Sequence, residues 1–323
     1  MRELRRPERN IATPPRRGLR ALRPLLVALP VAWLWRRLDA HALAAHLGAI
    51  PLRTLLAAAA CSALSIAAFG ERWRSLLRAW GAAAPTFRAT VALILEGFFW
   101  NLLPGGVAGD LTRSHAVHRS VGGLGNALAV VWFERLCGLA GLFVVALAAM
   151  PFAPSYPRWA PLVAAVGLVG ALAAFPLSAA ATGSGTIARF VAAIPVLGPR
   201  LGALARPSRP AWLGPALALS VATQAFAIAS MSIVVHATAP EARVASVLAL
   251  SPLVVLFTFV PLTPAGVGQR EAVFSLVYAQ AGVTADVAVA TSLATFSIGL
   301  LLPLLGGALA LHEYLRPRPR LEP

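Results

Sequence analysis

Charged residues are scarce in this sequence, and lysine is absent from it. Asp, Glu, Lys and Arg together make up 12% of the 323 residues, whereas 58% are hydrophobic. Soluble domains are about one quarter charged, so this composition lies outside their range. No stretch is long enough and polar enough to fold as a separate soluble domain, which excludes most conventional enzymes. The composition predicts an integral membrane protein.

Residues that carry metal or redox chemistry are also few. The two cysteines, Cys61 and Cys137, both lie in apolar runs, which is typical of packing residues rather than of a disulfide. His115 and His118 could share a helix face, but no further Cys, His or carboxylate stands at metal-ligand spacing. A Walker A sequence is missing, so any transport would run downhill or use a gradient. We therefore expect no metal and no cofactor.

The net charge is +16, and all 28 basic residues are arginines. They gather at the N-terminus, in alternate connections and at the C-terminus, which is typical of the cytoplasmic loops of membrane proteins rather than of a nucleic-acid-binding surface. Both termini are therefore predicted to be cytoplasmic, in a bacterial inner membrane. The basic and then apolar start resembles a signal peptide without a cleavage site, which favours an uncleaved first span.

Apolar runs define the expected membrane segments. Full spans are predicted at 22–36, 52–70, 126–150, 160–179, 211–236 and 286–311. Two further apolar regions, at 89–120 and 245–282, are interrupted by proline and glycine. Amphipathic helices at the membrane interface are predicted over 38–50 and 185–205. The expected domains are a disordered cytoplasmic tail (1–20), one transmembrane domain (21–312) and a second cytoplasmic tail (313–323).

The two interrupted regions repeat each other. Residues 104–107 read Pro-Gly-Gly-Val, and residues 264–267, at an offset of 160, read Pro-Ala-Gly-Val. Each half, 21–150 and 160–312, then reads as span, span, broken hairpin and span. The arginines place the start of the two halves on opposite sides of the membrane. The predicted fold is an all-α polytopic bundle with two inverted-topology halves, each with a Pro/Gly-broken re-entrant hairpin. The alternative is that the breaks are ordinary loops between short surface helices.

Two charged residues interrupt the apolar span at 126–150. Glu134 and Arg135 would both lie within the bilayer, where ionisable side chains are costly and commonly functional. Successive side chains on a helix point about 100° apart, so these two cannot pair well with each other. Each therefore needs a partner from another segment.

Charged pairs follow both breaks and supply candidate partners. Asp110 and Arg113 follow the first, and Arg270 and Glu271 follow the second, each at the predicted start of a helix. Helix N-termini favour anions, so Arg113 and Arg270 are predicted to hold a phosphate. The carboxylates would balance charge or recognise a cationic headgroup. Alternatively, these charges only neutralise one another and join the halves.

The residues before the first break complete the candidate site. Glu96, Trp100 and Asn101 could line the same cavity, and Glu96 could equally face the cytoplasmic interface. No residue is assigned a catalytic or metal-binding role. The predicted substrate-binding residues are Arg270, Arg113, Asp110, Glu134, Arg135, Glu271, Asn101, Pro104, Gly105, Gly106, Pro264 and Gly266.

Three segments carry a resemblance to a known family. They are 98–110 (FFWNLLPGGVAGD), the pair at 134–135 (ER) and 260–271 (VPLTPAGVGQRE). With them the chain, from about 20 to 312, resembles the lysylphosphatidylglycerol synthase transmembrane family of flippase-like proteins, including the flippase half of multiple peptide resistance factors. Ala265 stands where this motif more typically has glycine.

The resemblance implies a membrane domain that moves an aminoacylated phospholipid between leaflets. These 323 residues hold no stretch suited to the soluble aminoacyltransferase domain of the bifunctional members, so we expect transport rather than lipid synthesis. The expected partners are membrane lipids. A second hypothesis is a non-catalytic membrane partner of a separately encoded glycosyltransferase or lipid-modifying enzyme. A third is an intramembrane enzyme acting on a lipid carrier, with Glu134 and Asp110 as its carboxylates.

Overall fold

Every element in the described part of the chain is a helix. The computed structural model describes residues 48, 50–102, 108–153, 156–181, 207–258 and 269–315. The helices are α3 (Leu52–Ala79), α4 (Phe87–Trp100), α5 (Ala108–Val117), α6 (Leu124–Ala149), α7 (Ala160–Ala181), α10 (Leu213–Thr238), α11 (Val244–Thr258), α12 (Gln269–Tyr278) and α13 (Ala285–Leu315), with short 3-10 helices η1 (Met150–Phe152), η2 (Pro210–Trp212) and η4 (Ala279–Ala281). The predicted all-α class is confirmed.

Five helices are long and apolar enough to cross a membrane. They cover Leu52–Ala79, Leu124–Phe152, Ala160–Leu177, Pro210–Thr238 and Val287–His312. Each matches a predicted span, so the chain is a multi-pass membrane protein. The span predicted at 22–36, the N-terminal tail, the segment 185–205 and nearly all of 38–50 lie outside the described residues, as does the predicted C-terminal tail beyond residue 315.

Helix α3 is longer than its predicted span of 52–70. It continues through Arg72 and ends at Ala79. The end is set by Gly81, whose φ of 77° lies in the left-handed region that glycine adopts at little cost. The Ala82 N–H there donates to the Leu77 carbonyl at 3.1 Å, which satisfies one of the last free carbonyls of the helix.

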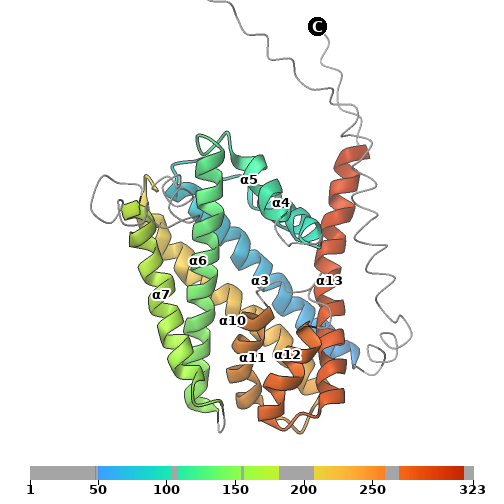
Figure 1. Ribbon diagram of the computed structural model, residues 1–323. Coiled ribbons are helices and arrows are strands. Elements are labelled where there is room, and N and C mark those ends of the chain that lie inside the picture. Colours follow the sequence, from blue (N-terminus) through green and yellow to red (C-terminus); the bar gives the residue numbers. More distant parts are fainter. Residues whose placement is uncertain are drawn as a thin grey trace, which may run out of the picture. The chain divides into compact units, whose positions relative to one another are not determined.

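The same order of long, short, short and long helices occurs twice. The first series is α3 to α6, and the second is α10 to α13. The two leading helices, α3 and α10, pack along each other, while α4 packs on α13 and α11 packs on α6. Figure 1 shows the short pair α4 and α5 at one end of the bundle and the short pair α11 and α12 at the other. The inverted topology of the halves and the re-entrant course of the breaks stay predictions.

Glycines allow the closest approaches between helices. A Cβ on Gly306 of α13 would overlap the backbone of Leu95 on α4, and one on Gly141 of α6 would stand 2.6 Å from the carbonyl carbon of Ser220 on α10. Association within a bilayer depends on packing, because lipid tails are as apolar as the side chains that they surround. Small residues at these crossings therefore hold the two series together.

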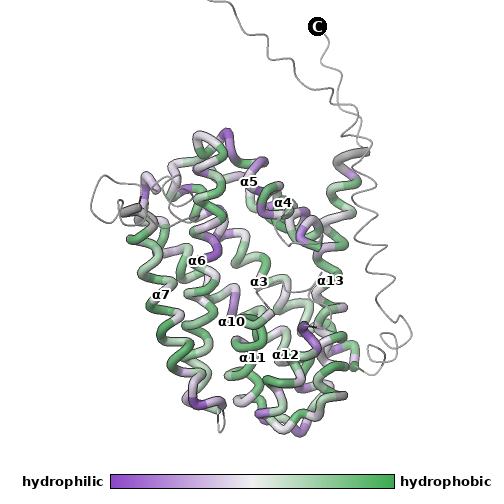
Figure 2. The backbone as a smooth tube through the Cα atoms, viewed as in Figure 1, coloured by the Kyte–Doolittle hydropathy of each residue, from purple (hydrophilic) through white to green (hydrophobic). Residues whose placement is uncertain are grey.

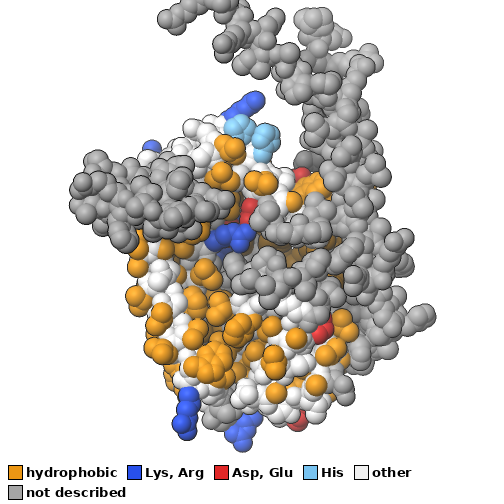
Figure 3. Space-filling view, viewed as in Figure 1, with side chains coloured by type: hydrophobic (Ala, Val, Ile, Leu, Met, Phe, Trp, Pro, Cys, Tyr) orange, Lys and Arg blue, Asp and Glu red, His pale blue; other side chains and the backbone are white. Residues whose placement is uncertain are grey.

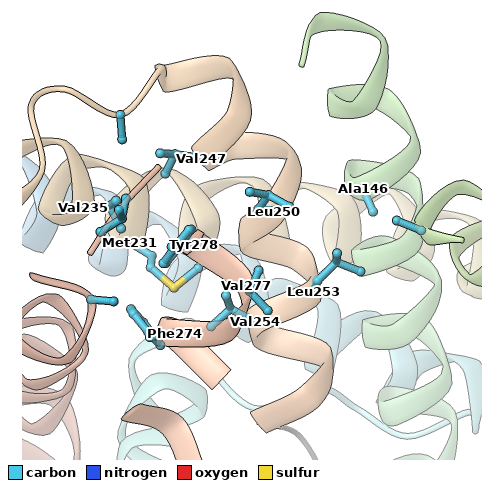
Figure 4. Packing of buried hydrophobic residues seen from close by; sticks show 14 of the residues in the cluster. Ala146, Met231, Val235, Val247, Leu250, Leu253, Val254, Phe274, Val277 and Tyr278 are labelled. Atoms are coloured by element: carbon cyan, nitrogen blue, oxygen red, sulfur yellow. The ribbon is translucent and has the colours of Figure 1, made fainter. Parts of the chain in front are cut away.

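One apolar cluster fixes the second pair of short helices. Figure 4 shows Leu250 and Leu253 of α11 and Val277 and Tyr278 of α12 packed beside α6 and α10, and all four are buried. The Tyr278 hydroxyl lies 2.8 Å from Ser251 Oγ, so the buried phenol has a hydrogen-bond partner. Apolar packing and this hydrogen bond therefore hold α12 in the core, independently of the charged residues at its N-terminus.

The surface of α7 is suited to contact with lipid. Its exposed apolar residues include Leu162, Val166 and Val169, each more than three-fifths exposed. Figure 2 shows hydrophobic colour along α7 and hydrophilic colour at α5 and at one turn of α6. In Figure 3 hydrophobic side chains gather on the face over α7 and α11, with basic side chains at the lower border. An apolar surface of this extent would be unstable in water and is expected in a bilayer.

Candidate functional site

Three arginines and two carboxylates form a network between α3, α5 and α6. Arg72 comes from α3, Asp110 and Arg113 from α5, and Glu134 and Arg135 from α6. Arg72 is 2% exposed, Arg113 3% and Glu134 6%. Buried charges are tolerated only when they are paired and hydrogen-bonded, so the four buried side chains depend on one another, while Arg135 is partly exposed. We call all five side chains the arginine–carboxylate network.

Each carboxylate in the network binds two arginines. Glu134 accepts hydrogen bonds from Arg72 Nη2 at 2.6 Å and from Arg113 Nη2 at 3.4 Å. Asp110 accepts from the same Arg113 nitrogen at 2.5 Å and from Arg135. The neighbours Glu134 and Arg135 therefore find their partners on other helices, as their positions in the sequence predict.

The arginines have more donors than the carboxylates occupy. Arg72 Nε, Arg113 Nε and Arg113 Nη1 are buried and have no hydrogen-bond partner among the described residues. The guanidinium carbons lie over aromatic rings instead: Arg72 Cζ is 4.4 Å from the centre of Phe69, and Arg113 Cζ is 5.4 Å from Phe69 and 4.9 Å from Trp73. Cation–π contacts offset part of the desolvation of these cations but leave their N–H groups available to an acceptor.

Arg72 was missed in the sequence-based site. The sequence ended the predicted span at residue 70, whereas α3 continues through Arg72 to Ala79 and buries that side chain. The signal available was its spacing: Arg72 and Trp73 come three and four residues after Phe69, which places both next to Phe69 on the surface of a continuing helix. Arg72 Nη1 also donates to Ser220 Oγ on α10 at 3.3 Å, which ties the network to the second helix series.

Asn101 bridges the first break. Its side-chain oxygen accepts a hydrogen bond from the Gly109 N–H at 2.8 Å and so joins the end of α4 to the first turn of α5. Trp100 Nε1 donates to Glu96 one turn earlier, at 3.2 Å. Outside the described residues lie the predicted break residues Pro104, Gly105, Gly106, Pro264 and Gly266.

Arg270 and Glu271 occupy a separate place from the network. They lie in the first turn of α12, where Arg270 Cζ is 4.0 Å from the centre of the Phe296 ring and Glu271 accepts from Ser292 Oγ at 3.2 Å, both on α13. Figure 1 shows α5 and α12 at opposite ends of the bundle. The sequence had grouped Arg113 with Arg270 at one phosphate site, whereas the described residues show two distinct clusters.

Residues 20–307, most of the chain, match the model of the lysylphosphatidylglycerol synthase TM region family. The chain belongs to this family. No curated protein matches the chain. The family assignment and the five apolar spans agree with each other, and the suspected resemblance is thereby confirmed.

In this lysylphosphatidylglycerol synthase TM region protein, a cavity of about 300 Å³ lies beside the network. It is formed by α3, α4, α10 and α13, the helices at which the two series meet. Its polar residues are Ser62, Ser65, Thr223, Ser230 and Thr295, among an apolar majority. Phe69 also lines this cavity, and its ring contacts the guanidinium groups of Arg72 and Arg113 as well as the ring of Phe98.

Proposed function

We propose that this chain is a lipid transporter of the bacterial inner membrane, with both termini in the cytoplasm. It would move a phospholipid or lipid-linked headgroup between leaflets while the acyl tails stay in the bilayer. The observation that carries the proposal is the position of the cavity, which is lined by helices of both series and by Phe69, whose ring centre lies 4.4 Å from Arg72 Cζ and 5.4 Å from Arg113 Cζ. The proposed activity forms and breaks no covalent bond.

The arginine N–H groups that have no partner within the described part of the chain support an anionic substrate. A buried N–H without an acceptor costs about 1–3 kcal/mol, and more for a charged group, so an incoming phosphate would remove an existing penalty as well as form new bonds. Arg72 and Arg113 would hold the phosphate, and Asp110 and Glu134 would hold those arginines in place. Asn101 would keep the break in the shape that this arrangement needs.

Arg270 and Glu271 suggest a second phosphate-binding site toward the other side of the membrane. Arg270 and Glu271 begin α12 much as Asp110 and Arg113 belong to the first turns of α5. If the halves are inverted, the two clusters would face opposite leaflets, and a phosphate would pass from one to the other as one half rocks against its counterpart. The side chain of Arg135 is more than one third exposed and would lie at the entrance to the arginine–carboxylate network.

A leaflet-exchange measurement on the purified full chain in liposomes tests this function. Wild-type protein should speed the exchange of labelled anionic phospholipid, read by a membrane-impermeant quencher, well above protein-free liposomes. Arg113→Gln keeps most of the side-chain volume but removes the cation, and should slow exchange by about tenfold or more. The matched control is Arg88→Gln, at an exposed arginine at the start of α4, which should leave the rate unchanged.

Two results would count against the transporter. Wild-type rates equal to those of empty liposomes, for folded protein and for all lipids tried, would reject it and favour the partner-subunit hypothesis. Equal exchange rates in wild type and Arg113→Gln would show that the protein transports lipid without using the arginine–carboxylate network.

A further inference from the structure

A second cavity, of about 490 Å³, lies between the start of α7 and the short pair α11 and α12. It is lined by Pro157 and Trp159 ahead of α7, by Phe257 and a neighbour on α11, and by one side of α12 from Val273 to Gln280. Among the described residues it shares no lining residue with the cavity between α3, α4, α10 and α13. The two cavities are therefore different places in the molecule, and we call this second one the α12 groove.

The large apolar side chains of the α12 groove are exposed. Leu276 is 73% exposed, Trp159 46% and Phe257 45%. Figure 3 shows hydrophobic side chains on the face over α7 and α11, so the groove continues the surface that is expected to face lipid. Lipid tails are as apolar as these side chains, and a bilayer leaves no space beside a protein empty. An acyl chain is therefore the expected occupant of the groove.

The groove also has a polar end. Gln280 lies in η4, directly after α12 and just before the turn at Gly282 that leads to α13. Trp159 combines an apolar ring with a polar N–H, and such residues gather at the membrane–water interface. Its ring centre lies 6.3 Å from that of Phe257, so the indole closes one side of the groove. A lipid whose chain follows α12 would thus have its headgroup near Gln280 and Trp159.

Arg158 gives this end of the groove a positive charge. It stands between the lining residues Pro157 and Trp159, is exposed, and forms no ion pair within the described part of the chain. Its long side chain can bring the guanidinium to the edge of the groove, where two parallel N–H groups suit phosphate oxygens. Unlike the buried arginines of the arginine–carboxylate network, Arg158 is accessible to a ligand without any movement of the helices.

We propose that the α12 groove binds one anionic phospholipid of the surrounding leaflet, with an acyl chain along α12 and the phosphate at Arg158. Helices α7 and α11 both pack on α6, so this lipid would fill the space beside their shared support. A zwitterionic lipid would bind more weakly, because its own cation competes with Arg158 for the phosphate. The lipid here would be retained rather than moved, and the proposal holds whether or not the chain transports lipid.

Quenching of Trp159 fluorescence by brominated acyl chains measures occupancy of the groove. The full chain would be placed in phosphatidylcholine liposomes with a small, increasing share of brominated phosphatidylglycerol or of brominated phosphatidylcholine. The Trp159 signal would be taken as the difference between wild type and Trp159→Phe. Half-maximal quenching should need about fivefold less brominated phosphatidylglycerol than brominated phosphatidylcholine, the effect of one arginine near the membrane surface.

Two arginine variants separate a site from general attraction of anionic lipid. Arg158→Gln should abolish the preference for phosphatidylglycerol. Arg243→Gln, at another exposed arginine in the connection before α11, removes the same charge outside the groove lining and should keep the preference. Unfolding temperatures would first show that both variants are folded.

Three outcomes would overturn the proposal. Equal quenching by the two lipids would mean that the groove holds ordinary bilayer lipid, and a preference that survives Arg158→Gln would place the phosphate elsewhere. Trp159 that neither lipid quenches, in folded protein, would mean that a second copy of the chain covers the groove. Leaflet exchange does not enter this measurement, so failure of the transport function would leave its result unchanged.

Discussion

Replacing Glu134 by alanine should lower the free energy of unfolding in detergent by about 3–5 kcal/mol, the usual result of breaking a buried ion pair from one side. Glu134 is 6% exposed and binds Arg72 and Arg113, which are more deeply buried still. Without this carboxylate Arg72 would lose the ion pair it makes here, and Arg113 would retain only Asp110. The loss can be measured by reversible denaturant unfolding followed by tryptophan fluorescence.

The matched control is the partly exposed ion pair between Glu71 and Arg74 on α3. These side chains are 35% and 19% exposed and lie three residues apart. Glu71→Ala should cost no more than about 1 kcal/mol, because water solvates the remaining arginine. Similar losses for both variants would mean that Glu134 is not in the buried network described here.

Replacing Gly306 by alanine should destabilise the protein by about 1–3 kcal/mol, the cost of overpacking a closed interior. A Cβ at this position would overlap the Leu95 carbonyl and stand 2.8 Å from the Glu96 nitrogen, both in the α4 backbone, which cannot rotate away as a side chain can. Helices α4 and α13 would have to separate. The unfolding midpoint in a mild detergent reports the change.

Gly299 provides the comparison within the same helix. A Cβ added there meets nothing within 4 Å. Gly299→Ala should therefore be neutral or stabilising by up to about 1 kcal/mol, since alanine favours a helix over glycine. If Gly306→Ala were as well tolerated as Gly299→Ala, the close contact between α4 and α13 would be contradicted.

The helices were largely predictable from the sequence, because the physics that selects them is local. A bilayer requires long uncharged runs, and five of the predicted spans appear with boundaries shifted by a few residues. The exception, α3, shows the limit of this rule. An arginine normally marks the end of a span, but Arg72 finds Glu134 and Ser220 on two other helices, and those contacts are not local in sequence.

The site could be predicted only in part, for the same reason. The need of Glu134 and Arg135 for partners on other helices followed from helix geometry, and the structure supplies Arg72, Arg113 and Asp110. The sequence could not show which of the two breaks provides these partners. The two breaks have similar sequences, and the motif gives no information on its depth in the bilayer. The hydroxyl-lined cavity had no sequence signal, since single serines and threonines from three helices meet only after packing.

The central claim is that lipid headgroups cross the membrane through this cavity. Covalent blocking of the cavity tests that claim most directly. Ser62→Cys, with Cys61→Ala and Cys137→Ala, places one thiol in the wall, and Ser297→Cys in the same background places one on α13 outside the described lining. The account predicts that modifying Ser62→Cys with a bulky charged thiol reagent abolishes lipid exchange in liposomes, while treating the Ser297→Cys protein does not. Full modification at Ser62→Cys with undiminished exchange would contradict it.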